Sequence, residues 1–196
     1  MQLLPNNLAD GDEVYTPDFA AKDMVEFFQP FGKMLEPCSG DGAILKYLSN
    51  ADWCEIQKGK DFFQYTSKVD WIITNPPYSQ FWKFLEHSMS LADNIVFLIP
   101  CYKVFNSVKT LKAIFKWGGI PHMRIMGTGN SLGFPYGYSI GAFYFKKGYS
   151  SSISYSFLGA HLTPLALDGA IAPDNQQVLP ADVLVGEGTL PEPPRQ

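Results

Sequence analysis

Hydrophobic and polar positions along this chain follow two alternating patterns. Apolar residues recur at helical spacing in segments that predict helices over about 18–28, 42–49, 79–92 and 107–117. Short, mostly apolar runs predict strands over about 33–36, 52–56, 69–74, 94–100 and 139–147. Strands that alternate with helices indicate an α/β fold, with a largely parallel sheet covered by helices on both faces.

The same periodicity indicates where the domain ends. We expect one domain over residues 1–150, in which the glycine-rich stretch 118–138 is mostly loop around a short strand near 122–126. Residues 151–196 lose the periodicity and predict a C-terminal extension or linker. The chain has no run of about 18 apolar residues and its start has no signal-peptide pattern. We therefore expect a cytoplasmic protein without a membrane partner.

Charge is distributed unevenly along the chain, whose net charge is −4. Residues 1–75 carry six Lys/Arg and twelve Asp/Glu, whereas residues 76–150 carry eight and two. Such a basic segment fits a nucleic acid, although lysines on one helix face are also an ordinary solvent-exposed surface. The three cysteines and three histidines lack the spacing of metal sites, so we expect free thiols and no metal.

The segment Asn75-Pro76-Pro77-Tyr78 directly follows a predicted buried strand. Two prolines cannot donate ladder hydrogen bonds, so the chain leaves the sheet in a stiff turn at its carboxyl edge, where open α/β sheets bind ligands. An amide, a carbonyl and an aromatic ring in one turn suit a planar substrate with an exocyclic amine. Its N–H groups would donate to Asn75 Oδ1 and to the Pro76 carbonyl. The alternative is a plain turn that ends a strand.

A glycine loop, Glu36-Pro37-Cys38-Ser39-Gly40-Asp41-Gly42, follows an earlier strand. Its glycines let a ligand approach the backbone closely. Glu36 and Asp41 would repel a pyrophosphate but attract the sulfonium and ammonium groups of S-adenosylmethionine. Glu55, at the end of the next predicted strand, is suited to accept hydrogen bonds from ribose hydroxyls, and Asp61-Phe62 to contact an adenine ring.

These motifs resemble the adenine-N6 amino-methyltransferases of DNA over about residues 13–147. NPPY at 75–78 is similar to the catalytic motif of that family, and EPCSGDG at 36–42 is similar to its cofactor loop. The resemblance implies a Rossmann-like, S-adenosylmethionine-dependent methyltransferase in which a flipped adenine stacks on Tyr78 while Asn75 and Pro76 hold its amine. It implies a catalytic turn of Asn75, Pro76, Pro77 and Tyr78. It implies cofactor contacts from Tyr15, Thr16, Pro17, Glu36, Pro37, Cys38, Gly40, Gly42, Glu55, Asp61, Phe62 and Asn75.

The chain departs from the family pattern in two places. Only twelve residues, 57–68, separate the second predicted strand from the catalytic strand, which implies a sheet trimmed on that side, as in compact phage-type members. No segment is long enough for a separate recognition domain. DNA contacts would fall to a second subunit, as a homodimer or a recognition subunit, or to Lys103, Lys109, Lys112, Lys116, Arg124 and Tyr136. The loop that holds Tyr136 is equally interpretable as a connection with its aromatic residues in the core.

Other functions use similar motifs. Adenine in RNA would undergo the same chemistry, and release-factor and ribosomal-protein methyltransferases use NPPY for a glutamine amide. A non-catalytic binding module would be expected to have lost NPPY or the glycine loop, and both are intact. Cytosine-N4 enzymes generally have Ser at the position of Asn75, which disfavours cytosine. We therefore expect a site-specific adenine-N6 DNA methyltransferase of a restriction–modification system or a phage, acting in a bacterial cell or a phage-infected host.

Overall fold

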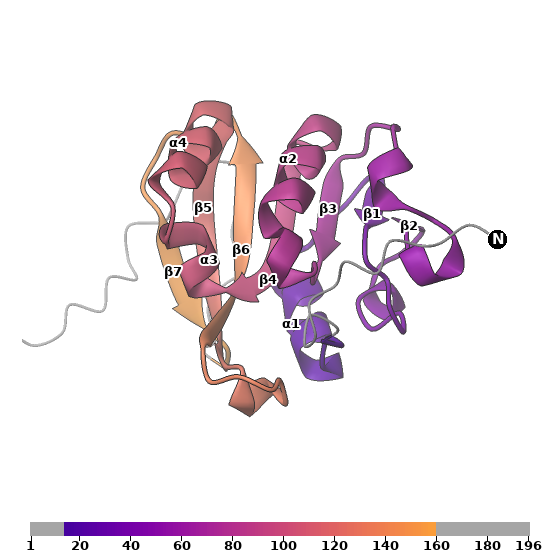
Figure 1. Ribbon diagram of the computed structural model, residues 1–196, viewed down its shortest axis with the longest axis horizontal. Coiled ribbons are helices and arrows are strands. Elements are labelled where there is room, and N and C mark those ends of the chain that lie inside the picture. The colour runs from indigo at the N-terminus through magenta and orange to yellow at the C-terminus, as the bar shows by residue number, and fades with distance from the viewer. Residues whose placement is uncertain (1–13, 160–196) are drawn as a thin grey trace, which may run out of the picture. The chain divides into compact units, whose positions relative to one another are not determined.

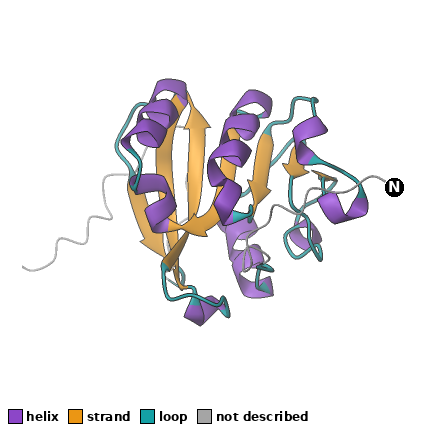
Figure 2. Ribbon diagram, in the orientation of Figure 1, coloured by secondary structure: helices purple, strands orange, loops and turns teal. Residues whose placement is uncertain are grey.

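The computed structural model describes residues 14–159, which form a seven-stranded mixed sheet with helices on both faces (Figure 1) (Figure 2). The strands lie in the order β2 (Asp52–Trp53), β1 (Met34–Glu36), β3 (Trp71–Thr74), β4 (Asn94–Pro100), β6 (Ser139–Lys147), β5 (Gly118–Thr128) and β7 (Ser154–Phe157). Strands β1 to β4 are parallel, β6 is antiparallel to both β4 and β5, and β7 is parallel to β5. The predicted α/β fold is confirmed. So is its trimmed side, because within residues 14–159 the sheet ends at the two-residue strand β2.

The helices divide between the two faces of the sheet. Helix α1 (Asp18–Phe28) covers one face, whereas α2 (Phe81–Leu91), α3 (Cys101–Phe105) and α4 (Val108–Trp117) lie on the other (Figure 1). In β6, Phe143 and Phe145 belong to the core cluster that includes α2 and α4, while the ring of Tyr144 lies 5.8 Å from that of Phe28 in α1. Successive residues of one strand thus serve both faces, which explains why the buried strands are apolar throughout.

The segment 42–49 is not the helix that its apolar residues predict. Only Leu45–Tyr47 form a 3-10 turn, and Leu48 is already extended, with φ −96° and ψ 131°. The chain re-enters the sheet at Asp52. The segment between Gly42 and Asp52 is therefore too short to hold a helix of normal length and its connections. The second strand is correspondingly shorter than the predicted 52–56.

The stretch after residue 118 contains the longest strand of the sheet rather than mostly loop. Strand β5 has eleven residues and pairs with β6 and β7. Its first glycines allow close strand approach, because a Cβ on Gly118 would lie 2.0 Å from the carbonyl oxygen of Lys146.

Strand β7 lies inside the segment 151–196 that the sequence predicts to be an extension. Only Ser156 of its four residues is buried, so it shows no apolar pattern. The remainder of that segment, 160–196, lies outside the described residues, as do residues 1–13.

Candidate active site

The catalytic turn and the glycine loop meet where the chain order reverses along the sheet. From β1 the chain passes to β2 on one side, and then to β3 and β4 on the other. The carboxyl ends of β1 and β3 are therefore adjacent, and the crevice at such a switch point is where open α/β sheets bind ligands. Residues 36–42 extend from β1, and Asn75–Tyr78 extend from β3.

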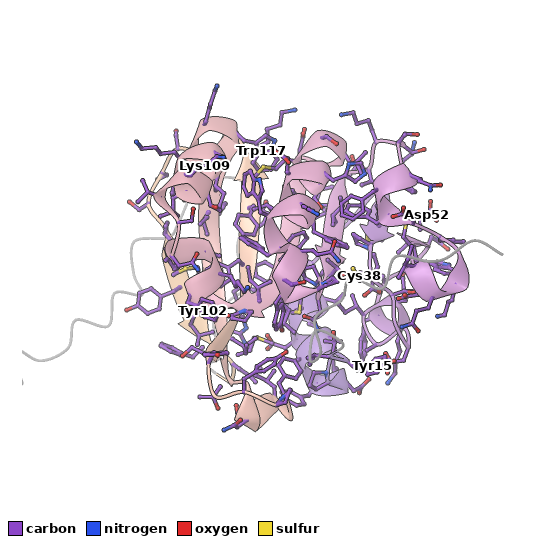
Figure 3. The ribbon with its side chains drawn as sticks, in the orientation of Figure 1. Tyr15, Cys38, Asp52, Tyr102, Lys109 and Trp117 are labelled. Carbon is purple, nitrogen blue, oxygen red and sulfur yellow. The ribbon has the colours of Figure 1, made fainter. Side chains whose placement is uncertain are left out.

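A small pocket lies at this edge of the sheet. Tyr15 and Cys38, which are labelled in Figure 3, are two of its lining residues. Its wall is formed by Val14, Tyr15, Thr16, Glu36, Cys38, Ser39, Gly40, Asp41, Ala43, Ile44 and Asn75. Six of the residues expected from the sequence to contact a cofactor are thus brought together: Tyr15, Thr16, Glu36, Cys38, Gly40 and Asn75. Sequence reasoning missed Val14, Ala43 and Ile44, which carry no chemical signal of their own.

Glu36 is a buried acid at the wall of this pocket. It is 2 % exposed, and its Oε2 has no hydrogen-bond partner within residues 14–159. Burial, together with the nearby carboxylates of Asp41 and Glu55, raises the pKa of Glu36 to about 8. The side chain is therefore mostly protonated at neutral pH, and a cation placed beside it would favour its ionised form.

The peptide groups of Gly40 are held on both sides by the segment after β2. The Gly40 N–H donates to Glu55 Oε2 at 2.7 Å, and Lys58 Nζ donates to the Gly40 carbonyl oxygen at 2.8 Å. Gly40 has φ +49°, and a Cβ there would lie 3.5 Å from the ring of Tyr15. These contacts fix the loop backbone, so Glu55 contributes to loop geometry in addition to its predicted contact with a ribose.

Asn75 is oriented by a residue sixty-one positions earlier in the chain. Its Nδ2 donates to the Val14 carbonyl oxygen at 2.9 Å. Its Oδ1 is buried and has no hydrogen-bond partner in the described part of the chain. A buried amide oxygen without a partner is costly unless a ligand donates to it, so Asn75 presents an acceptor at the pocket.

The rest of the catalytic turn positions an aromatic ring. Pro77 precedes the 3-10 turn Tyr78–Gln80, and Tyr78 is 8 % exposed. The Tyr78 ring centroid lies 6.1 Å from that of Tyr136, in the connection between β5 and β6. Tyr136 therefore contacts the turn that follows β3, and its role in binding DNA stays a prediction.

The remaining predicted cofactor residues do not line the pocket. Phe62 is buried and stacks on Phe84 of α2 at 5.2 Å, while Asp61 Oδ1 accepts a hydrogen bond from the Phe63 N–H. The other three lie on the chain beside the pocket and shape its loops: Pro17 at the start of α1, and Pro37 and Gly42 in the glycine loop.

The predicted DNA contacts separate into two groups. Lys109, Lys112 and Lys116 are exposed on α4, and Lys103 is half-buried in α3. Arg124 is only 5 % exposed, and its guanidinium donates to both carboxylate oxygens of Asp23 at 2.7 Å. Because Arg124 is enclosed and paired, it cannot reach a phosphate group, and we remove it from the predicted nucleic-acid surface.

Residues 14–159 contain no group of three or more His, Cys, Asp or Glu side chains arranged to hold a metal ion. None of their helices has the length and apolar character needed to cross a membrane.

The fold is that of the S-adenosylmethionine-dependent methyltransferases. A candidate class I methyltransferase of this kind from Listeria monocytogenes is 16 % identical, with a TM-score of 0.60 over 78 % of this chain and 68 % of that chain. The modification subunit of a candidate type I restriction enzyme from Vibrio vulnificus is 16 % identical, with a TM-score of 0.55 over 74 % and 47 %. A type I restriction–modification methyltransferase subunit from Streptococcus thermophilus is 13 % identical, with a TM-score of 0.55 over 75 % and 48 %.

The chain thus spans about half the length of these two restriction–modification subunits. No protein-family model and no curated protein matches the sequence. At such low identity the likeness establishes the fold, and the function rests on the site.

Proposed function

We propose that this protein transfers a methyl group from S-adenosylmethionine to the N6 amine of adenine in DNA. The observation that carries the proposal is the buried Oδ1 of Asn75, which has no partner among the described residues and lies at the wall of the pocket. An acceptor in that place fits an N–H donor from the substrate.

The side chains at the wall of the pocket have the charge that suits the proposed cofactor, which supplies the methyl group when bound. The buried Glu36, with its raised pKa, would be stabilised as an anion by a sulfonium or ammonium group, and Asp41 adds negative charge beside it. Gly40 has a left-handed backbone, and the ring of Tyr15 lies 3.5 Å from the position that a Cβ on Gly40 would take. Tyr15 would thus be in place to contact a bound cofactor.

The catalytic turn would activate the amine by accepting its hydrogens. The Val14 carbonyl holds the Asn75 amide so that Oδ1 faces the substrate, and the Pro76 carbonyl is the second acceptor. These hydrogen bonds increase electron density on a nitrogen whose lone pair is otherwise delocalised into the ring. The nitrogen would then bond to the methyl carbon as the carbon–sulfur bond of the cofactor breaks and leaves a neutral thioether, and the nitrogen would lose one proton to solvent.

The remaining features support a base within DNA as the substrate. Tyr78 offers a ring on which an extruded adenine could stack, at an extrusion cost of about a few kcal/mol. Because Tyr78 is covered and contacts Tyr136, the ring of Tyr136 has to move aside to admit a base. The basic segment and the similarity to modification subunits favour DNA over a protein substrate.

The test incubates the protein with labelled S-adenosylmethionine and, separately, DNA, RNA and protein substrates, followed by nucleoside and amino-acid analysis. We expect N6-methyladenine in DNA. Asn75→Ala should lower methyl transfer by about 100-fold or more while cofactor affinity stays within a few-fold. Asn106→Ala, at the exposed end of α3, is the matched control and should retain activity.

Equal activity of Asn75→Ala and the wild type would contradict the assignment of the catalytic turn. Label found only in RNA or in a glutamine side chain would show that the substrate is not DNA, while the proposed methyl transfer to a planar amine or amide would stand.

A further inference from the structure

Four tyrosines form a continuous series of ring contacts from the catalytic turn to the surface. The ring centroids are 6.1 Å apart for Tyr78 and Tyr136, 5.8 Å for Tyr136 and Tyr138, and 5.0 Å for Tyr138 and Tyr102. Tyr78 is 8 % exposed, whereas Tyr102 is 41 % and Tyr138 is 52 % exposed. The series therefore begins in the core and ends with two rings in contact with solvent.

The topology of the sheet brings these tyrosines together. Strand β5 is parallel to β4, since β6 is antiparallel to both, so the connection 129–138 emerges at the same edge as the catalytic turn. Tyr102 lies in α3, directly after β4, and Figure 3 shows it toward the same edge as Tyr15. The exposed rings are thus contributed by two segments at the carboxyl edge.

The connection that carries Tyr138 has a defined conformation. The Gly129 N–H donates to the Tyr138 carbonyl oxygen at 2.7 Å, and the Phe134 N–H donates to the Gly129 carbonyl oxygen at 2.8 Å. Phe134 is buried and contacts the ring of Tyr136 at 6.3 Å. A held backbone and a buried anchor favour a preformed binding surface over a loose loop.

A cation lies beside the exposed rings. Lys103 Nζ lies 5.6 Å from the centroid of Tyr102. Residues 94–138, which include both exposed rings, contain no Asp or Glu. Exposed aromatic faces beside a cation, in a segment without acids, are the features by which proteins bind single-stranded nucleic acids.

We propose that Tyr138 and Tyr102 form a stacking platform for unpaired bases that flank the target base, with Lys103 near the intervening phosphate. This inference rests on the proposed function. It specifies that the DNA substrate is single-stranded or locally unpaired. The ring centre of Tyr138 lies within about 12 Å of that of Tyr78. Because successive bases of a stacked strand are about 3.4 Å apart, a strand with one base at Tyr78 can place a near neighbour at Tyr138.

The test measures binding of an end-labelled single-stranded DNA oligonucleotide by fluorescence anisotropy, without cofactor. Tyr138→Ala should weaken binding about fivefold or more, the usual effect of losing one base–aromatic stack. Tyr138→Phe should bind like the wild type, since stacking needs only the ring. Tyr138→Leu keeps an apolar side chain against Tyr102 and should bind as weakly as Tyr138→Ala, so a loss is not explained by altered folding.

Two controls distinguish the loss of base stacking from the loss of a positive charge and from the loss of any exposed aromatic ring. Phe31→Ala removes a ring that is 64 % exposed and contacts Trp71 at the opposite, amino edge of the sheet, and should not change binding. Lys103→Gln should reduce the salt dependence of binding, whereas Tyr138→Ala should leave it unchanged.

Unchanged binding in both Tyr138→Ala and Tyr138→Leu would overturn the platform, whether or not the protein methylates DNA. Tighter binding to a fully paired duplex than to the single strand would overturn it as well. Conversely, a protein that binds the strand through Tyr138 but methylates no adenine would support the platform and contradict the proposed function.

Discussion

The properties of individual site residues depend on contacts that the sequence does not reveal. An acid at position 36 is visible in the glycine loop, but its pKa of about 8 results from burial in the folded protein and from the carboxylates of Asp41 and Glu55. Likewise, Asn75 is recognisable from its motif, whereas the contact with the Val14 carbonyl that fixes its amide joins two separate segments. Residue identity was predictable, and the electrostatic state and orientation were not.

The buried Glu36 leads to a prediction about pH. The ligand-free protein holds a proton on Glu36 up to about pH 8, and a bound cation would displace it. Cofactor affinity should therefore rise with pH up to about pH 8, by at most tenfold per pH unit, and calorimetry in buffers of different ionisation enthalpy should detect proton release. Glu36→Gln should abolish both effects.

The same shift also affects folding. The ordinary pKa of the unfolded side chain is 4.5, so between that value and about 8 the folded state binds the extra proton. Glu36 therefore lowers the free energy of unfolding as pH rises through this window.

A pH-independent cofactor affinity in the wild type would contradict the assigned role of Glu36.

Secondary-structure elements were predictable where burial is uniform. The helix over 18–28 and the strands 94–100 and 139–147 agree with the structure because each has an apolar pattern of its own. The full length of strand β5 was not predictable because glycines that permit close packing interrupt its apolar pattern. Strand β7 was not predictable because serines interrupt its pattern. Those serines pair with polar residues of β5: Ser154 and Ser156 contact the two ring nitrogens of His122, and Ser156 also accepts from Arg124.

The docking of α1 onto β5 provides a stability prediction. Asp23 and Arg124 form a bidentate ion pair with side chains that are 18 % and 6 % exposed. Asp23→Ala leaves the guanidinium buried without its carboxylate, so it should lower the free energy of unfolding by about 3 kcal/mol in denaturant titrations. Glu26→Ala, which removes the exposed ion pair with Lys22, is the matched control and should cost less than about 0.5 kcal/mol.

The double variant Asp23→Ala with Arg124→Met tests the mechanism of this loss. Removing both charges should restore a large part of the stability, because the penalty arises from the unpaired cation. A double variant no more stable than Asp23→Ala would assign the loss to packing around α1.

On the scale of the whole molecule, charge is divided along the sheet. The side built from β1, β2 and their loops carries Glu36, Asp41 and Glu55, while the lysines of α3 and α4 lie beyond β4. The sequence predicted this division from its segments, but not how the lysines are placed. Figure 3 shows Lys109 toward the edge opposite Tyr15 and Tyr102, so α4 would contact phosphates away from the target base.

That placement predicts an effect on DNA binding without an effect on the reaction. Lys109→Gln with Lys112→Gln removes two exposed charges from α4, and each lost phosphate contact should reduce the slope of log affinity against log salt by about 0.9 for a duplex. Affinity should fall at low salt, while kcat at saturating DNA stays unchanged because neither lysine lines the pocket. Lys22→Gln, on the opposite face in α1, should alter neither quantity. An unchanged salt slope in the double variant would show that the DNA does not cross α4, and would leave Lys103 as the cation nearest the bound strand.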